Sequence, residues 1–435
     1  MEWLPRLKRD RWLAGIALAV IVTLIVAPVG HGENAQAARQ SKPRVSREIM
    51  HWWNSPSEAA AMAEIRGSYE ARGLRWIESR QTNRSAMRHK LVERLAGGVP
   101  PLANLWQAGS DFPQVARSAM FRDVDAVARQ QQWDRQLLPA VRDQVRVDGR
   151  YFFAPTNVHG DNWLFFNAAL LRRHGIAEPR SLDEALSAME ALDRAGLDAV
   201  ALGQSEWEAQ VAFAGIMLAH LDRSQYDRLY RRHDATVLDS KEGRAGFAAF
   251  DRFRRLAMRS KRRTDWADAA RAVGRGEAGF QILGDYAKAE ILRTGVDLER
   301  DIGCLITSPA STGQLVVIDG FVFPLDRNAP EDQSHLALAA TIMQRDVQQR
   351  VARAKGALPA RADAISATPD KCERQMIARL RQPGSALGDP LGALGPERVA
   401  TFNRAVGHYF LDPRVSREQA VREMLTVLRT PFGLS

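Results

Sequence analysis

The sequence is organised around the stretch Met50-His51-Trp52-Trp53-Asn54-Ser55-Pro56-Ser57-Glu58, in which two adjacent tryptophans precede a helix start. Ser55 with Glu58 three residues later forms a capping box, and Pro56 takes the first helical position. A short strand is expected to end at Trp53. In open α/β sheets, ligands bind beyond the carboxyl ends of strands, at helix N-termini. The tryptophan pair is therefore either core or a stacking platform for a flat, partly apolar ligand such as a sugar.

Strands and helices alternate on either side of this stretch. The hydrophobic pattern predicts helices at 56–72 and about 83–95, long amphipathic helices over 168–260, and strands at 74–77, 102–106, 151–155, 278–284 and 314–324. A mostly helical remainder follows, apart from the loop 383–395. This alternation predicts parallel sheet covered by helices, in two α/β lobes that exchange chain more than once. The length of 435 residues, long for one core, also favours two lobes.

The charge distribution argues against nucleic acid as a partner. The net charge is +10, but basic and acidic residues are interspersed. The densest basic run, 259–263, lies near the end of an expected helix and has no aromatic–basic motif beside it. It is best explained as a solvated helix face.

The first 38 residues have the pattern of an export segment. A basic start precedes the apolar run Trp12–Val29, and Ala35-Gln36-Ala37 offers a cleavage site. An uncleaved anchor helix remains an alternative, because the apolar run is close to membrane-spanning length. No cysteine stands directly after the cleavage site, which argues against a lipid anchor. We expect a signal peptide over residues 1–38 and a periplasmic protein.

Two cysteines are present, Cys304 and Cys372. In an oxidising compartment they either form a disulfide, contributing roughly 4 kcal/mol in the chain-entropy model, or stay as buried thiols.

Enzyme and cofactor motifs are weak or absent. Residues 274–279 match the dinucleotide pattern G-x-G-x-x-G, but a helix precedes them and a strand follows, the reverse of the order required. The sequence has no G-x-S-x-G elbow, no H-E-x-x-H and no metal-spaced Cys/His cluster. We expect no cofactor and no metal. Carboxylates are plentiful, so a glycosidase pair remains an alternative.

Several short segments follow one another in a distinctive order: 50–53, 133–134, 137–139, 154–159, 162–164, 203–204, Trp207, 265–266, 276–281, 284–288, Cys304, 318–319, 355–361 and Cys372. In this order they resemble the carbohydrate solute-binding proteins of ABC transporters (extracellular solute-binding protein family 1), closest to the glucose/mannose-binding branch. The resemblance covers nearly all of the chain after the export segment.

The resemblance implies a two-lobed periplasmic-binding-protein fold with a hinge between the lobes. Lobe I would comprise 46–155 and 316–364, and lobe II 156–315 and 365–435. It also implies a disulfide between Cys304 and Cys372. Such a protein is no enzyme: as a monomer, it would capture a sugar and deliver it to the membrane permease subunits of an ABC importer.

The resemblance also assigns ligand-binding residues. The tryptophan pair would stack on the sugar, two tryptophans would face it from lobe II, and polar side chains would bind its hydroxyls. The full set is Trp52, Trp53, Glu58, Gln107, Asp111, His159, Trp207, Trp266, Asp285, Asp319 and Lys355. Structural alternatives are a helix cap for Glu58, a satisfied hinge histidine for His159, core packing for the lobe II tryptophans, and solvated surface charges for the last three residues.

Some positions depart from the family pattern. A glycine-rich loop is replaced by 81–85, Gly160-Asp161 stands where a basic residue is common, and Tyr286 replaces a tryptophan. A late ligand histidine is missing from 385–395. Two further hypotheses are therefore kept beside the interpretation as a transporter protein: a regulatory relative that acts on a membrane sensor, and a secreted carbohydrate-active enzyme.

Overall fold

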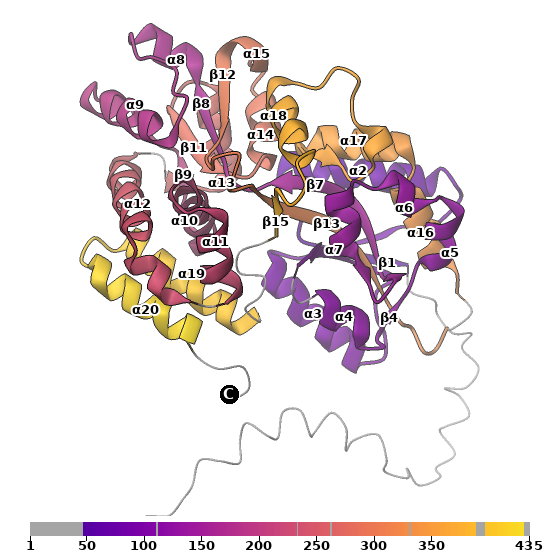
Figure 1. Ribbon diagram of the computed structural model, residues 1–435. Helices are drawn as coiled ribbons and strands as arrows, with labels where there is room; N and C mark the ends of the chain where they lie inside the picture. The colour runs from indigo at the N-terminus through magenta and orange to yellow at the C-terminus, as the bar shows by residue number, and fades with distance from the viewer. Residues whose placement is uncertain are drawn as a thin grey trace, which may run out of the picture. The chain divides into compact units, whose positions relative to one another are not determined.

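The tryptophan stretch begins in a sheet with the strand order β14-β7-β13-β3-β1-β2 (Figure 1). Strand β1 pairs in parallel with β2 and β3, whereas β13 runs antiparallel to both β3 and β7. The strands are β1 (Glu48–His51), β2 (Ile77–Arg80), β3 (Ala103–Ala108), β7 (Phe153–Gly160), β13 (Gln314–Pro324) and β14 (Leu358–Pro359). The expectation of parallel sheet is correct for β1, β2 and β3. It is wrong for the β3–β13–β7–β14 part of this sheet, where neighbouring strands are antiparallel because β13 returns from the second half of the chain in the opposite direction.

The computed structural model describes residues 47–109, 112–232, 234–261, 263–329, 332–388 and 396–429. The expected signal peptide and Asp111 lie outside these residues. Among the described residues, no helix combines the length and apolar character that a membrane crossing requires.

Helix α2 (Pro56–Glu70) covers the first sheet and begins as expected. The Ser55 hydroxyl accepts a hydrogen bond from the Glu58 N–H at 3.2 Å, and the Glu58 carboxylate accepts one from the Ser55 N–H at 3.0 Å. Its buried face carries Ala61, Met62, Ile65 and Tyr69. The other helices of this part are α3 (Arg84–Ala96), α4 (Phe112–Arg117), α5 (Asp125–Gln130), α6 (Trp133–Gln136), α7 (Pro139–Val145), α16 (Ser334–Ile342) and α17 (Arg345–Lys355).

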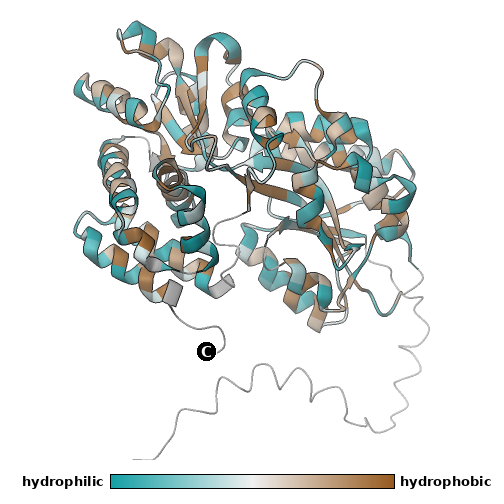
Figure 2. Cartoon of the chain, viewed as in Figure 1, coloured by the Kyte–Doolittle hydropathy of each residue, from teal (hydrophilic) through white to brown (hydrophobic). Residues whose placement is uncertain are grey.

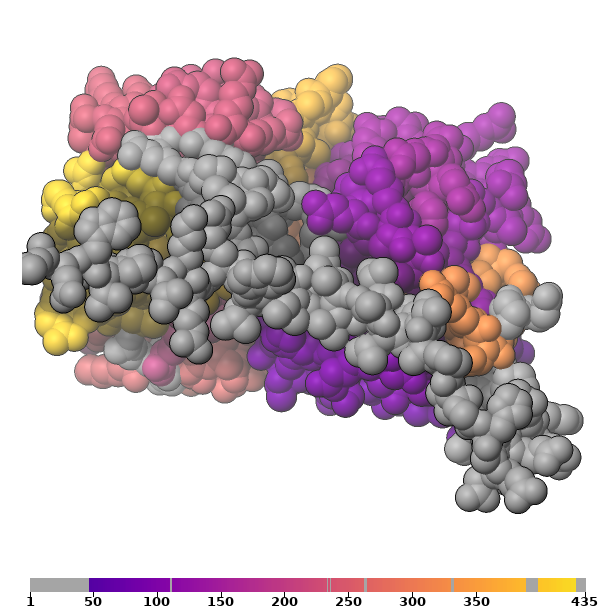
Figure 3. Space-filling view, turned by 90° about the horizontal axis from the view of Figure 1, so that it is seen from below, coloured from indigo at the N-terminus to yellow at the C-terminus, as the bar shows by residue number. Residues whose placement is uncertain are grey.

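A second, antiparallel sheet has the order β11 (Phe280–Leu283), β8 (Trp163–Asn167), β12 (Ile302–Ile306). Its longer helices are α8 (Ala168–Arg173), α9 (Leu182–Arg194), α10 (Glu206–His220), α12 (Lys241–Arg259), α13 (Trp266–Gly274), α14 (Tyr286–Leu292), α18 (Lys371–Leu380), α19 (Pro396–Leu411) and α20 (Arg417–Arg429), and its one-turn helices are α11 (Arg223–Tyr226) and α15 (Leu298–Asp301). The strands are mostly apolar, whereas the outer helices alternate polar and apolar residues (Figure 2). Seen from below, the yellow C-terminal helices and the indigo N-terminal segments lie at opposite ends of the face (Figure 3).

Two long strands connect the two sheets. Strands β7 and β13 pair from Phe153 to Gly160, and the chain passes from β7 into β8 and from β12 into β13. This is the expected two-lobed periplasmic-binding-protein fold. The exact lobe boundaries remain a prediction.

Some expected elements are shifted. The strand expected at 74–77 begins only at Ile77, the first strand ends at His51 rather than Trp53, and β7 continues past residue 155 to Gly160. In contrast, β13 has the bounds that were expected. The glycine-rich segment 274–279 joins the end of α13 to β11, so the helix-before-strand order is confirmed.

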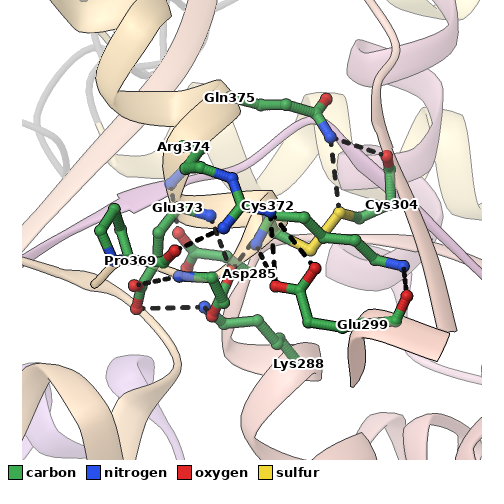
Figure 4. A network of polar contacts seen from close by, with 12 residues as sticks. Asp285, Lys288, Glu299, Cys304, Pro369, Cys372, Glu373, Arg374 and Gln375 are labelled. Carbon is green, nitrogen blue, oxygen red and sulfur yellow. Dashed lines mark hydrogen bonds and ion pairs between the residues drawn. A yellow bond between two sulfur atoms is a disulfide. The ribbon is translucent and has the colours of Figure 1, made fainter. Parts of the chain in front are cut away.

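Cys304 of β12 and Cys372 of α18 form a disulfide, with their Cα atoms 6.0 Å apart (Figure 4). The pairing that the resemblance implies is therefore confirmed, and the two free thiols are excluded.

Candidate functional site

The site begins at the tryptophan pair, where chain segments far apart in the sequence meet. Trp53 is buried and Trp52 is half-buried. The ammonium group of Lys355, at the end of α17, lies 4.4 Å from the centroid of the Trp53 ring, within the range of a cation–π contact. Lys355 therefore covers one face of the ring that was expected to stack on a sugar.

Glu58 joins this contact while it caps α2. Its Oε2 accepts hydrogen bonds from the N–H groups of Asn54 and Ser55 at 2.9 and 3.0 Å, and its Oε1 lies 3.1 Å from Lys355 Nζ. Its capping role, one of the two alternatives, is confirmed. The same carboxylate also belongs to the charged cluster.

His159, near the end of β7, lies at the centre of the cluster. Its Nδ1 pairs with Asp285, and its Nε2 lies 3.3 Å from Asp319 Oδ2. Asp285 also accepts a hydrogen bond from the Gly160 N–H at 2.9 Å. Burial lowers the pKa of His159, but the two carboxylates outweigh burial and raise the pKa to about 9. The imidazole is therefore charged at neutral pH.

Asp319 lies on β13 and connects His159 to the first sheet. Its Oδ1 accepts a hydrogen bond from Gln107 Nε2 at 3.1 Å, and its Oδ2 is 4.0 Å from Lys355 Nζ. Burial raises the pKa of Asp319, but His159 and Lys355 overcome this and hold it below the usual value for aspartate. Arg84 donates a hydrogen bond to Gln107 from the N-terminus of α3.

The solvated-surface alternative for the three charged residues is wrong. Lys355, Asp285 and Asp319 are 2%, 3% and 3% exposed. Each lies among oppositely charged or hydrogen-bonding groups, because a buried charge without such partners is very costly.

The second lobe contributes aromatic rings around Tyr286. The centroid of Tyr286 is 5.2 Å from Trp266, 5.4 Å from His159 and 6.4 Å from Trp207. Its hydroxyl donates a hydrogen bond to Asp161 at 3.2 Å. Burial, followed by the Asp161 charge, raises the pKa of this phenol well above its usual value. Trp207 is 38% exposed, so it is not a core residue.

Every expected site residue that the structure describes belongs to this neighbourhood; Asp111 lies outside the described residues. Tyr286 was noted only as a departure from the family pattern, yet it touches both tryptophans of the second lobe. Sequence reasoning missed Arg84, and also Glu208, a buried residue next to Trp207. Burial raises the pKa of Glu208 to about 7, although the Ser205 hydroxyl lowers it. The spacing of Ser205 and Glu208, which matches a capping box, was the available signal.

The cluster is suited to hydrogen bonding and ring stacking. Among the described residues, no group of histidine, cysteine or carboxylate side chains has the arrangement of a metal site. Two cavities are lined by other residues: one of about 940 Å³ between α10, α19 and α20, and one of about 780 Å³ beside Phe121 and Arg122.

Comparison with known proteins gives the family. Residues 75–374 match the model of the bacterial extracellular solute-binding protein family. A "probable sugar-binding periplasmic protein" of Brucella suis is 25% identical over 427 residues, covering 96% of this chain and 98% of its own. A Rhizobium meliloti protein of the same name is 25% identical over 401 residues, covering 90% and 95%. An uncharacterised ABC transporter extracellular-binding protein of Pyrococcus horikoshii is 22% identical, covering 84% of each chain.

Solved structures share the fold at low sequence identity. A chitin oligosaccharide binding protein superposes with a TM-score of 0.74 at 15% identity, covering 88% of this chain and 98% of its own. A Streptomyces glaucescens receptor, solved without ligand and with acarbose, gives 0.67 at 16% identity, covering 89% and 98%.

The family match covers well over half of the chain, and an extracellular family agrees with the expected export and with the periplasmic names of the relatives. The chain belongs to the bacterial extracellular solute-binding proteins, a family of non-enzymatic receptors.

Proposed function

We propose that the protein is a periplasmic receptor that captures a neutral sugar and delivers it to the permease of an ABC importer. The ligand would be a glucose-like hexose or a small oligosaccharide, as in the glucose/mannose-binding branch. The names of the relatives support a sugar ligand, and the Pyrococcus relative supports the transporter. The protein would work as a monomer.

The observation that carries this proposal is the combination of clustered aromatic rings and paired charges. Two cations, Lys355 and His159, face the three carboxylates of Glu58, Asp285 and Asp319. An anionic ligand would find both of these cations already paired. A neutral polyol suits such a cluster, because its hydroxyls donate to carboxylates and accept from the ammonium and imidazolium groups.

Aromatic faces complete the proposed site. Sugar C–H groups pack on indole rings, and Trp52, Trp207 and Trp266 each keep part of their surface exposed. For a sugar to stack on Trp53, Lys355 must move from the ring face that it covers. Lys355 would then bind a sugar hydroxyl in place of the ring.

The test is titration calorimetry of the mature protein against glucose, mannose, galactose, a few disaccharides and a uronic acid. Micromolar affinity, about −8 kcal/mol, for one neutral sugar is expected. Binding of the uronic acid alone would contradict the charge argument. A folded sample that binds none of these compounds would refute the sugar-receptor proposal.

A matched pair of variants tests the role of Lys355. Lys355→Met removes a buried cation from the Trp53 ring, and we expect at least a tenfold loss of sugar affinity. Arg254→Met removes a cation that lies at the same distance, 4.4 Å, from the Tyr409 ring, in the core of the second lobe. The control should lose stability and keep its affinity. Equal affinities of the two variants would remove Lys355 from the site.

One observation favours a second candidate, a diverged receptor that regulates a membrane sensor. In the structure the charged groups of the site pair with one another, and Lys355 covers the ring of Trp53. This candidate would be favoured if none of the sugars bound in the calorimetric titrations and if the protein captured a membrane sensor protein from solubilised membranes.

A further inference from the structure

Glu290 of α14 is a buried carboxylate that the proposed site does not use. Its side chain is 0% exposed. Its Oε1 accepts a hydrogen bond of 2.8 Å from the backbone N–H of Ser57, 233 residues away, and its Oε2 pairs with Arg271 of α13. Glu290 therefore connects the first turn of α2 to the helices of the second sheet.

On the side of the second sheet, α14 is firmly anchored. Lys288, one turn beyond Asp285, is buried and pairs with Asp370 at 2.6 Å and with Glu373 at 3.4 Å. Both carboxylates belong to the N-terminus of α18, which the Cys304–Cys372 disulfide attaches to β12 (Figure 4). Glu290 must therefore move together with the second sheet.

On the side of the first sheet, the helix start leaves a donor for Glu290. The capping box of α2 satisfies the N–H groups of Ser55 and Glu58, but the N–H of Ser57 has no acceptor within the helix. Amides at a helix N-terminus favour a negative charge. In the structure the Ser57 N–H donates to Glu290 instead.

The surrounding packing is close. A Cβ atom added at Gly356, at the end of α17, would lie 2.8 Å from both Asp285 O and Ala289 N. Backbone therefore touches backbone where α14 meets the first lobe. The Ser57–Glu290 bond lies in this interface.

We propose that Glu290 is a closure contact: it stabilises the closed arrangement of the two lobes without touching the sugar. The inference rests on the proposed function, in which sugar binds between the lobes. A bond that forms only in the closed state shifts the open–closed equilibrium before any ligand arrives. Sugar affinity then rises by up to the factor by which the bond favours closure.

The experiment compares Glu290→Ala and Glu290→Gln with wild type by small-angle X-ray scattering without sugar, and by calorimetry and stopped flow with sugar. Arg271 retains Asp268 as a partner, so the alanine variant leaves no orphaned cation. We expect a larger radius of gyration for Glu290→Ala without sugar, an unchanged radius with saturating sugar, and about tenfold weaker affinity from faster dissociation. Glu290→Gln, which keeps an acceptor, should be intermediate.

Glu184→Ala is the control, because this carboxylate accepts from the Arg180 N–H at the start of α9, within one lobe. It should change neither scattering nor affinity. If Glu290→Ala scatters like wild type without sugar, the closure contact is refuted, even where affinity falls. If scattering changes as expected and no sugar binds to any form, the closure contact stands and the proposed function fails.

Discussion

Replacing His159 by glutamine tests the charged cluster through the pH dependence of stability. The pKa of His159 is about 9 in the folded protein, against an ordinary value of 6.5. The folded state therefore holds the proton more tightly than the unfolded state. The resulting stabilisation is complete below about pH 6.5 and is lost as the pH rises through about 9. At about 1.4 kcal/mol per pH unit, the two pKa values correspond to about 3 kcal/mol of unfolding free energy.

The assay is urea denaturation of wild type and His159→Gln at constant ionic strength, from about pH 6 to about pH 10. Wild type should lose about 3 kcal/mol more than the variant over this interval. At the acidic end of this interval, where His159 is protonated, the variant should be less stable than wild type, because Asp285 and Asp319 lose the cation between them.

His335→Gln provides a control of opposite sign. His335 is also buried, and burial, followed by the charge of Arg122, lowers its pKa. The contribution of His335 to folding stability is lost as the pH falls below about 6.5. Above that pH, the unfolding free energy of His335→Gln should therefore decrease with pH as it does in wild type. If His159→Gln and wild type give parallel curves from about pH 6.5 to about pH 10, His159 is not held as a buried cation.

Three more changes have defined outcomes. Burial raises the pKa of Glu208 from 4.5 to about 7, so the native protein loses stability as the pH rises through this range. Glu208→Gln should remove up to about 3 kcal/mol of this pH-dependent loss of stability. Equal shifts of melting temperature between about pH 5 and about pH 8 in wild type and variant would contradict this prediction. Cys304→Ser should lower stability by about 4 kcal/mol without changing sugar affinity, and two titratable thiols in the untreated protein would refute the disulfide. Trp53→Ala would lower the unfolding free energy by about 3–5 kcal/mol because the ring is buried, so Trp53→Phe is the more informative change. Calorimetry should show that Trp53→Phe binds sugar more weakly than wild type. Wild-type affinity in this variant would remove Trp53 from the site.

Local signals in the sequence predicted the helix start correctly and the edge of the sheet poorly. The capping box of α2 depends on four consecutive residues, so it is visible in the sequence and appears in the structure as expected. Strand β2 is different: it has β1 as its one partner, and its side chains are half-buried or exposed. Its sequence therefore shows no alternation of polar and apolar residues. The strand was expected at 74–77 instead, because the residues just before β2 are more apolar. The orientation of β13 could not be predicted, because it depends on the route of the chain through the second sheet.

The residues of the site came from a resemblance, and their mutual pairing could not be read from the sequence. His159 of β7 contacts Asp285, the N-cap residue of α14, and Asp319 of β13, which lie 126 and 160 positions further along the chain. No local sequence pattern indicates such contacts. A buried charge in the sequence looks like a surface charge until its partners are known. The same holds for Glu290, whose acceptor role depends on a backbone N–H in another lobe.

The pairing within the cluster has a consequence for ligand selection. Because Lys355 already has Glu58 and the Trp53 ring as partners, a sugar gains only the difference between the bonds it makes and the bonds it replaces. A sugar with a misplaced or missing hydroxyl would displace Lys355 and leave a buried ammonium or carboxylate without a partner. The cost of such an unpaired group is larger than the gain from one good hydrogen bond. In the proposed site, affinity for the correct sugar would therefore be moderate and the wrong epimer would be strongly rejected. Polar groups that pair with one another are therefore compatible with a selective receptor. Lys355→Met should lower selectivity, because its affinity should fall more for the preferred sugar than for the epimers.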